Sequence, residues 1–155
     1  MEDRIECGPD GFHRRLYQVG APSLSNATGQ TPGMRRVEAI SGASVGSSAL
    51  WMGQTHVAPA TRSANHHHGK SETGIYILSG HPEFVFLDDD EETRLATSPG
   101  DYIYVPPWVP HREENPDPVA EAVVVLARTT QEAIVVNLDD LRWVGPVGIG
   151  SVDLC

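Results

Sequence analysis

Three consecutive histidines, His66 to His68, precede an apolar run in the stretch ANHHHGKSETGIYILSG. Side chains two apart in an extended segment point to the same side, so His66 and His68 are expected to project together, with His67 facing away. Glu72 lies beyond a short glycine-containing bend that can turn its carboxylate back toward the same point. These residues are typical of half a metal site, although a solvated polar cluster near a loop explains them equally well.

A further candidate ligand lies far along the chain, in the stretch GDYIYVPPWVPHREEN. His111 follows three prolines, Pro106, Pro107 and Pro110. Proline fixes the backbone φ angle and cannot join a hydrogen-bonded ladder, so this loop is expected to be stiff and to present the next side chain in a defined direction. A histidine displayed in this way favours a metal-binding role.

The two stretches together resemble the two motifs of the cupin superfamily, G-x5-H-x-H-x3-4-E-x6-G and G-x5-P-x-G-x2-H-x3-N. The spacing looks like that of the small single-domain, RmlC-like bacterial cupins with the type-2 conserved barrel. The matching positions are His66, His68, Glu72, Gly100, Pro106, His111 and Asn115. Three departures fall at turn positions: Ala60 and Trp108 stand in place of glycines, and Gly80 comes one residue late.

The resemblance implies an all-β jelly-roll barrel, also called a double-stranded β-helix, with the ligand residues inside it. His66, His68, Glu72 and His111 would then hold one divalent transition metal ion. Three neutral imidazoles and a carboxylate suit Fe, Mn, Ni, Zn or Cu. A closed structural zinc site more typically uses cysteines, so open coordination and chemistry are favoured.

Two residues are the candidate catalytic groups. Glu72 is a ligand that could loosen to act as a base, and Tyr76 shares its strand parity and could point inward beside the metal, with core packing as the alternative. Whether His67 or His56 contributes to the site is left open, and Arg62 is a candidate contact for an acidic substrate. Because ligand histidines must be neutral, metal affinity is expected to fall as the pH drops through about 6 to 6.5.

The expected function is a metal-dependent enzyme acting on a small organic molecule. The chemistry is either dioxygenase-type cleavage or Lewis-acid catalysis of the isomerase, cyclase or lyase kind. The alternative from another class is a non-catalytic cupin that binds or senses a small ligand and carries a bound metal. A metal-free sugar-nucleotide epimerase is disfavoured because it has no need of four ligand residues.

The elements that must position these residues are short and rich in Val, Ile, Tyr and Phe, with Gly, Pro, Ser or Asp between them, which predicts a barrel or sandwich of strands. The acidic run Asp88–Glu92 is expected to form a hairpin tip rather than a cation site. Residues 1–33 are interpreted as an irregular arm, 34–140 as the barrel and 141–155 as a loose tail. The predicted strands are Arg35–Ile40, Ser48–Val57, Gly74–Gly80, Glu83–Asp88, Asp101–Pro106, Glu121–Ala127 and Glu132–Leu138.

Composition limits the partners and the compartment. Eleven Lys and Arg against 21 Asp and Glu give a formal charge of −10, which argues against nucleic acid and an anionic membrane as partners. The longest apolar runs are too short to span a bilayer, and the N-terminus does not resemble a secretory signal. With Cys7 and Cys155 interpreted as reduced thiols, a cytoplasmic protein is expected, and a homodimer is the default for a small barrel.

Overall fold

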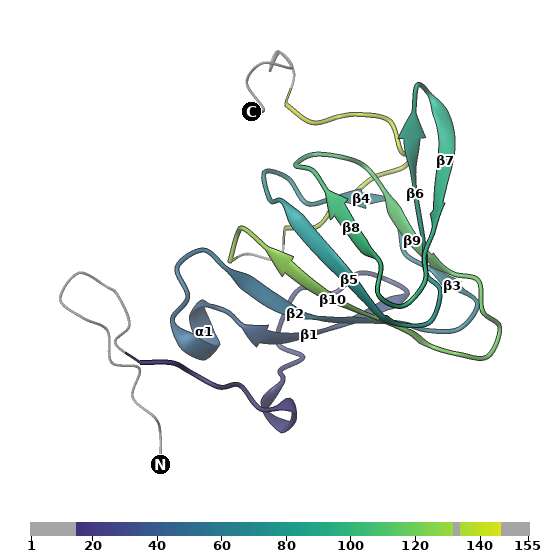
Figure 1. Ribbon diagram of the computed structural model, residues 1–155. Helices are drawn as coiled ribbons and strands as arrows, with labels where there is room; N and C mark the ends of the chain where they lie inside the picture. Colours follow the sequence, from purple (N-terminus) through teal and green to yellow (C-terminus); the bar gives the residue numbers. More distant parts are fainter. Residues whose placement is uncertain (1–14, 132–133, 147–155) are drawn as a thin grey trace.

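The computed structural model describes residues 15–131 and 134–146, and this part of the chain is mostly antiparallel β-structure (Figure 1). The all-β expectation is therefore confirmed. No helix in these ranges is long and apolar enough to cross a membrane. The elements are η1 (Ala21–Ser23), β1 (Met34–Ile40), α1 (Gly42–Val45), β2 (Trp51–Val57), β3 (Thr61–Arg62), β4 (His66–His67), β5 (Thr73–Ser79), β6 (Glu83–Asp88), β7 (Glu91–Ala96), β8 (Tyr102–Val105), β9 (Arg112–Asn115), β10 (Ala122–Arg128) and β11 (Val136–Asn137).

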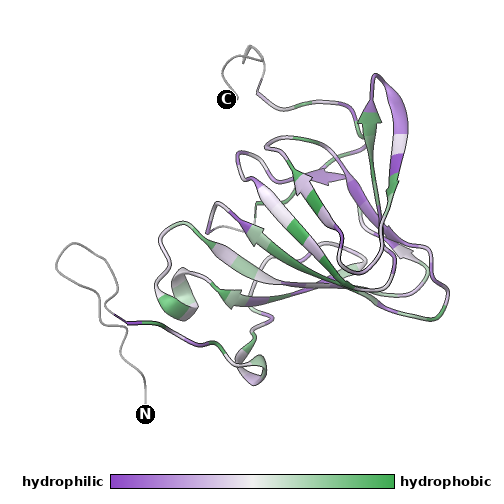
Figure 2. Cartoon of the chain, in the orientation of Figure 1, coloured by the Kyte–Doolittle hydropathy of each residue, from purple (hydrophilic) through white to green (hydrophobic). Residues whose placement is uncertain are grey.

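Each apolar predicted strand overlaps an observed strand, whereas short or polar strands were missed. β7 (EETRLA) and β9 (REEN) lack the apolar alternation that marks a strand in sequence. They form because backbone pairing with β6 satisfies their hydrogen bonds. Figure 2 shows β7 as mainly hydrophilic beside the more apolar β6.

The strands form one large sheet and two smaller ones. The large sheet has the order β1-β2-β10-β5-β8, the second has the order β3-β9-β6-β7, and β11 pairs with β4. An isolated bridge between His66 and His111 joins β4 to the start of β9. Figure 1 shows the large sheet on one side of the barrel and the β6–β7–β9 layer on the other.

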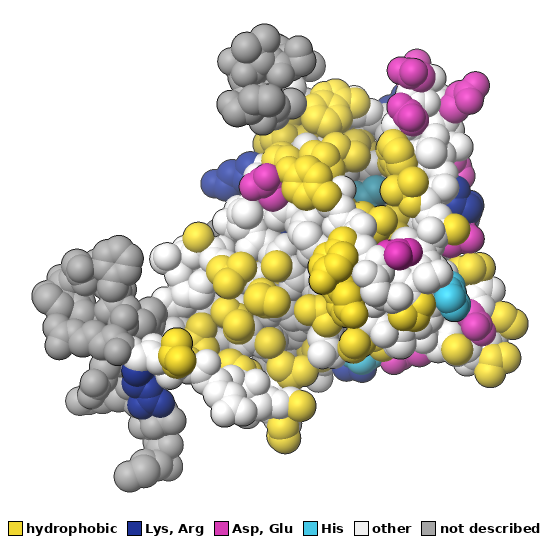
Figure 3. Space-filling model, in the orientation of Figure 1, with side chains coloured by type: hydrophobic (Ala, Val, Ile, Leu, Met, Phe, Trp, Pro, Cys, Tyr) yellow, Lys and Arg dark blue, Asp and Glu magenta, His cyan; other side chains and the backbone are white. Residues whose placement is uncertain are grey.

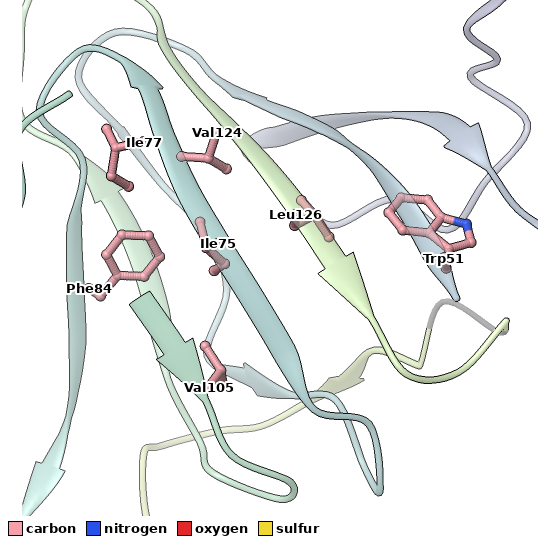
Figure 4. Packing of buried hydrophobic residues seen from close by; sticks show 7 residues of the cluster. All are labelled: Trp51, Ile75, Ile77, Phe84, Val105, Val124 and Leu126. Carbon is pink, nitrogen blue, oxygen red and sulfur yellow. The ribbon is translucent and has the colours of Figure 1, made fainter. Parts of the chain in front are cut away.

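Alternation along β5 and β10 builds the core between the sheets. Thr73, Ile75 and Ile77 are buried, while Gly74 and Leu78 on the opposite face are exposed. Phe84 of β6 packs against this row from the second sheet (Figure 4). The cluster comprises Trp51, Ile75, Ile77, Phe84, Val105, Val124 and Leu126.

The acidic run forms the tip of the β6–β7 hairpin, as predicted. Asp89 and Asp90 are the two turn residues, with φ angles of 48° and 65°. A two-residue hairpin with positive φ at both central positions is a turn in which Asp is well tolerated. The remaining acidic residues, Asp88, Glu91 and Glu92, are paired strand residues.

The strands begin at Met34 and end at Asn137 within the described ranges. The described part of the expected arm, residues 15–33, contains η1 and a backbone bridge from Ser25 to Glu38 of β1. Residues 1–14 and 147–155, in the expected arm and tail, lie outside the described residues, as do both cysteines.

Candidate metal centre

The backbone brings the two histidine stretches together. His66 and His111 exchange backbone hydrogen bonds, each N–H donating to the other carbonyl at 2.9 Å. β4 is also paired with β11, with His67 opposite Val136. His66 and His111, 45 positions apart in the sequence, are thereby direct neighbours.

Three imidazoles converge in the space between the sheets. The ring centroid of His66 lies 5.0 Å from that of His68 and 4.5 Å from that of His111. The ring centroids of His68 and His111 are 5.0 Å apart. One ring nitrogen from each histidine lies within 4.8 Å of the others. All three side chains are buried. The spacing suits three ligands around one ion.

Each ring has the hydrogen bond that prepares it for metal binding. The Nδ1 atoms of His66, His68 and His111 lie 2.7, 2.9 and 2.9 Å from the carbonyl oxygens of Ala64, Ile134 and Val109. A carbonyl only accepts, so Nδ1 carries the proton and Nε2 has a free lone pair. Among the described residues, Nε2 of His66 and of His111 is buried without a hydrogen-bond partner. The donor set therefore fits a divalent ion.

The surroundings keep these histidines neutral. Burial, with a smaller contribution from the neighbouring His111, lowers the pKa of His66 from 6.5 to about 3. Burial also lowers the pKa of His111 to about 4 and holds that of His68 well below 6.5. Neutral imidazole is the form that binds metal. The expected loss of affinity near pH 6 to 6.5 is therefore displaced to lower pH.

Glu72, the fourth predicted ligand, lies outside this group of histidines. The residue is exposed, and its Oε1 accepts a hydrogen bond from the Tyr104 hydroxyl at 2.8 Å. The reason is strand parity: Thr73 is the residue that β5 turns into the barrel, so the preceding position faces outward. The bend after His68 does not swing the carboxylate inward.

Tyr76 also lies on the outer face of β5, as its shared parity with Glu72 requires. Its ring packs against that of Tyr102 at 5.0 Å, away from the buried Thr73–Ile77 row. The inward position considered for Tyr76 is not the one observed.

The remaining histidines and the candidate arginine have other surroundings. His67 is buried against Trp108 at 5.4 Å, and its Nδ1 accepts from the Gly69 N–H. His56 lies 2.8 Å from a Glu121 carboxylate oxygen. Arg62 is exposed on β3.

The two residues that stand in place of motif glycines have the left-handed backbone conformation that glycine favours. Ala60 has a φ angle of 51° and Trp108 one of 67°. A non-glycine residue in the left-handed region is strained by roughly 1–2 kcal/mol. The Trp108 N–H donates to the Gly69 carbonyl at 2.8 Å, which fastens the proline-rich loop to the turn after His68. The glycine departures therefore alter side chains while the turns persist.

A cavity of about 650 Å³ opens beside His111, between β6 and β8. Figure 3 shows a hollow rimmed by apolar side chains with a histidine visible in it. Tyr104 is also among the residues that line this cavity. The other lining residues are Phe84, Val85, Phe86, Leu87, Asp89, Asp90, Leu95, Ile103, Val105, Pro106, Val109, Pro110, Leu141 and Trp143.

Sequence reasoning missed three buried charged residues, Arg36, Glu113 and Arg128. Arg128 continues the inward row of β10, and Glu113 lies two residues after His111 with the same parity. Burial raises the pKa of Glu113 to about 7, opposed by the charge of Arg36. Strand parity is the signal that could have identified Glu113 and Arg128.

Comparisons with known proteins agree with this fold. A family model described as "Cupin domain" matches residues 53–127. No curated protein matches the chain. Many solved structures are similar, and the three described below have 17–21% identity, a level that shows the fold alone.

The polyketide cyclase RemF from Streptomyces resistomycificus has 17% identity and a TM-score of 0.64, over 83% of this chain and 89% of that chain. Oxalate decarboxylase from Bacillus subtilis at pH 4.6 has 21% identity and a TM-score of 0.65, over 88% of this chain and 35% of the other. An oxalate oxidase in complex with the substrate analogue glycolate has 18% identity and a TM-score of 0.60, over 82% of this chain and 63% of that chain. The family match identifies residues 53–127 as a cupin domain, and the jelly-roll barrel agrees with it.

Proposed function

We propose that this chain is a metal-dependent enzyme acting on a small organic molecule with an apolar body, by Lewis-acid chemistry of the isomerase, cyclase or lyase kind. The observation that carries the proposal is the convergence of His66, His68 and His111, with Nε2 of two of them buried and unpaired among the described residues. A divalent ion held by these nitrogens supplies a Lewis acid that polarises a carbonyl oxygen and stabilises the negative charge developing there.

The ligand set favours this chemistry over dioxygen activation. Three neutral imidazoles contribute no negative charge, so a divalent ion held by them would keep its full charge as a Lewis acid. Three histidines with an open position are a known catalytic zinc arrangement, whereas non-haem iron oxygenases commonly use two histidines and a carboxylate. Glu72, the carboxylate the motif would supply, is instead bonded to Tyr104.

The cavity favours an apolar substrate. Its walls are mostly aliphatic and aromatic, and it reaches one of the three histidines. Pockets of roughly 300–1,000 Å³ with few polar groups suit small organic molecules. The similar structures include a polyketide cyclase, an oxalate oxidase and an oxalate decarboxylase, which supports an enzymatic role for this barrel.

Tyr104 and Glu72 form a hydrogen-bonded pair outside the group of histidines. Tyr104 lines the cavity, and its hydroxyl donates to the Glu72 carboxylate. That hydrogen bond raises the pKa of Tyr104, so the phenol stays protonated at neutral pH. Because both side chains lie on the outer face of β5 and β8, neither is assigned a role in proton transfer.

Metal binding by protein purified without a histidine tag tests the proposal. We expect one divalent ion per chain, and we expect His66→Ala and His111→Ala to lower its affinity at least about 10- to 100-fold. His81→Ala is the matched control, since His81 is an exposed histidine outside the group. Glu72→Gln is expected to retain metal affinity. Binding that survives loss of His111 would refute the site.

Activity measurements separate the remaining alternatives. Solvent deuterium exchange next to a substrate carbonyl, catalysed without oxygen uptake, supports the Lewis-acid reaction, and His111→Ala is expected to abolish it because the ion is lost. Oxygen consumption by the iron-loaded protein would instead support a dioxygenase. Tight ligand binding without turnover across a substrate panel would favour the sensory cupin.

We also propose that the protein is a homodimer formed through the outer face of the large sheet. Leu78, Tyr102 and Tyr104 on this face are 49%, 77% and 61% exposed. At a formal charge of −10, two copies repel each other over most surfaces. This mainly apolar face is where two like-charged copies can approach at least electrostatic cost.

A further inference from the structure

Arg128 is a buried arginine on the inner face of the large sheet. Alternation in β10 turns Ala122, Val124 and Leu126 inward, and Arg128 continues that row with 1% of its surface exposed. Among the described residues, none of its three guanidinium nitrogens has a hydrogen-bond partner. Buried charges are normally paired or hydrogen-bonded, because an isolated charge is strongly destabilising away from water. A structural role alone therefore does not account for Arg128.

Trp51 orients this guanidinium without using its donors. The Cζ atom of Arg128 lies 3.9 Å from the centroid of the Trp51 ring. Stacking of this kind engages the flat face of the guanidinium. The five N–H groups lie in its plane, where the ring accepts nothing from them. The indole is itself held in place, since its Nε1 donates to Glu38 at 3.3 Å.

No described carboxylate forms an ion pair with Arg128. Glu38 is the acid whose charge acts on it, and the oxygens of Glu38 accept from Ser41 and Trp51. Burial lowers the pKa of Arg128 to about 10, which leaves the side chain protonated at neutral pH. Arg36 adds a second buried cation, and it donates to Thr31 and Gly29. Arg128 is thus a buried cation without an ion-pair partner among the described residues.

The position of Arg128 connects it to the metal centre. Its Cα partner on β5 is Thr73, whose buried hydroxyl also lacks a partner among the described residues. The following residue, Thr129, exchanges hydrogen bonds with Glu72, in the turn after His68. The end of β10 is therefore hydrogen-bonded to the turn that follows His68, a proposed metal ligand.

We infer that Arg128 forms an anion-binding subsite in the barrel that takes a carboxylate group of the substrate. A planar carboxylate can accept two parallel hydrogen bonds from the guanidinium fork, with the Thr73 hydroxyl as a nearby donor. The inference rests on the proposed function in one respect, that the anion belongs to the molecule on which the metal centre acts. It narrows the substrate class to small organic carboxylates.

Carboxylate binding to metal-free protein tests this subsite separately from the metal. The probes are benzoate and acetate, each compared with its neutral amide, benzamide or acetamide, by calorimetry and thermal shift. We expect both carboxylates to bind the wild type more tightly than their amides. Arg128→Met is expected to weaken carboxylate binding roughly 10- to 100-fold, and Arg35→Met, which changes an exposed arginine, to leave it unchanged.

Thermal stability distinguishes binding from a structural role. Replacing an unpaired buried charge with an apolar side chain of similar length is commonly neutral or stabilising, so Arg128→Met is expected to fold with an unchanged or raised Tm. Arg128→Lys is a second variant that keeps the charge and loses the fork, and it is expected to bind carboxylates weakly.

Equal carboxylate binding by wild type and Arg128→Met, or no carboxylate binding by the wild type, would overturn the inference. His111→Ala is expected to lose metal and retain carboxylate binding. Failure of metal binding alone would thus refute the proposed function and leave the subsite intact.

Discussion

The metal-free protein is expected to lose stability steeply in mild acid, because its buried histidines stay neutral. The pKa of His66 is lowered to about 3 and that of His111 to about 4, and that of His68 is lowered as well. In the unfolded chain each of these groups titrates near 6.5. Between about pH 5 and 6 the unfolded state therefore binds about three more protons at these positions than the folded state.

Glu113 acts in the opposite direction. Its pKa is raised to about 7 in the folded protein, so over the same interval the folded state holds a proton that the unfolded state has released. The net difference is about two protons, and stability falls as the pH falls. At 1.36 kcal/mol per proton and pH unit, the expected loss is about 2–3 kcal/mol per pH unit. This is a large part of the 5–15 kcal/mol typical of a domain.

Urea unfolding of chelator-treated protein across this interval, followed by tryptophan fluorescence, measures the slope. Two variants change it in opposite directions. His111→Gln removes one of the three histidines and is expected to reduce the slope to about one proton, while Glu113→Gln removes the opposing group and is expected to raise it to about three. Identical slopes for wild type and both variants, or a flat wild-type profile, would refute the reasoning.

Three further predictions concern the ion, a turn and the assembly. Zinc affinity is expected to change little between pH 7 and about 5.5, because His66 and His111 compete for protons only near pH 3 and 4; calorimetry showing a 100-fold loss over this range would contradict the lowered pKa values. Ala60→Gly is expected to stabilise the protein by about 0.5–1 kcal/mol, or to raise its Tm by roughly 1–4 °C. Glycine adopts the left-handed φ of this turn without strain, and the strain relieved exceeds the entropic cost of introducing glycine. A lower Tm in thermal unfolding would count against strain at this turn. Tyr102→Glu is expected to convert a dimer to a monomer in light scattering, while Val119→Glu, at an exposed position outside the sheet, leaves the dimer intact; an unchanged mass for Tyr102→Glu would place the interface elsewhere.

The local sequence was sufficient to predict the apolar strands and the histidines of the site. Each apolar strand carries its own signal in β-branched and aromatic residues bounded by turn formers, and β6 was predicted with its observed bounds. The histidine stretches carry spacing that is independent of distant contacts. Strands such as β7 and β9 could not be predicted, because their stability comes from pairing with β6 rather than from their own composition.

Only the tertiary structure decided which side chains face the interior. A shift of one residue reverses the direction of a strand side chain, and the sequence around Glu72 does not fix where β5 begins. Because the strand turns Thr73 inward, the carboxylate expected at the metal lies outside with Tyr104. The burial of Arg128 and Glu113 likewise follows from strand parity only once the strand bounds and the inward face are known. Their altered pKa values arise from being enclosed between two sheets, which is a property of the packed barrel and of no single segment.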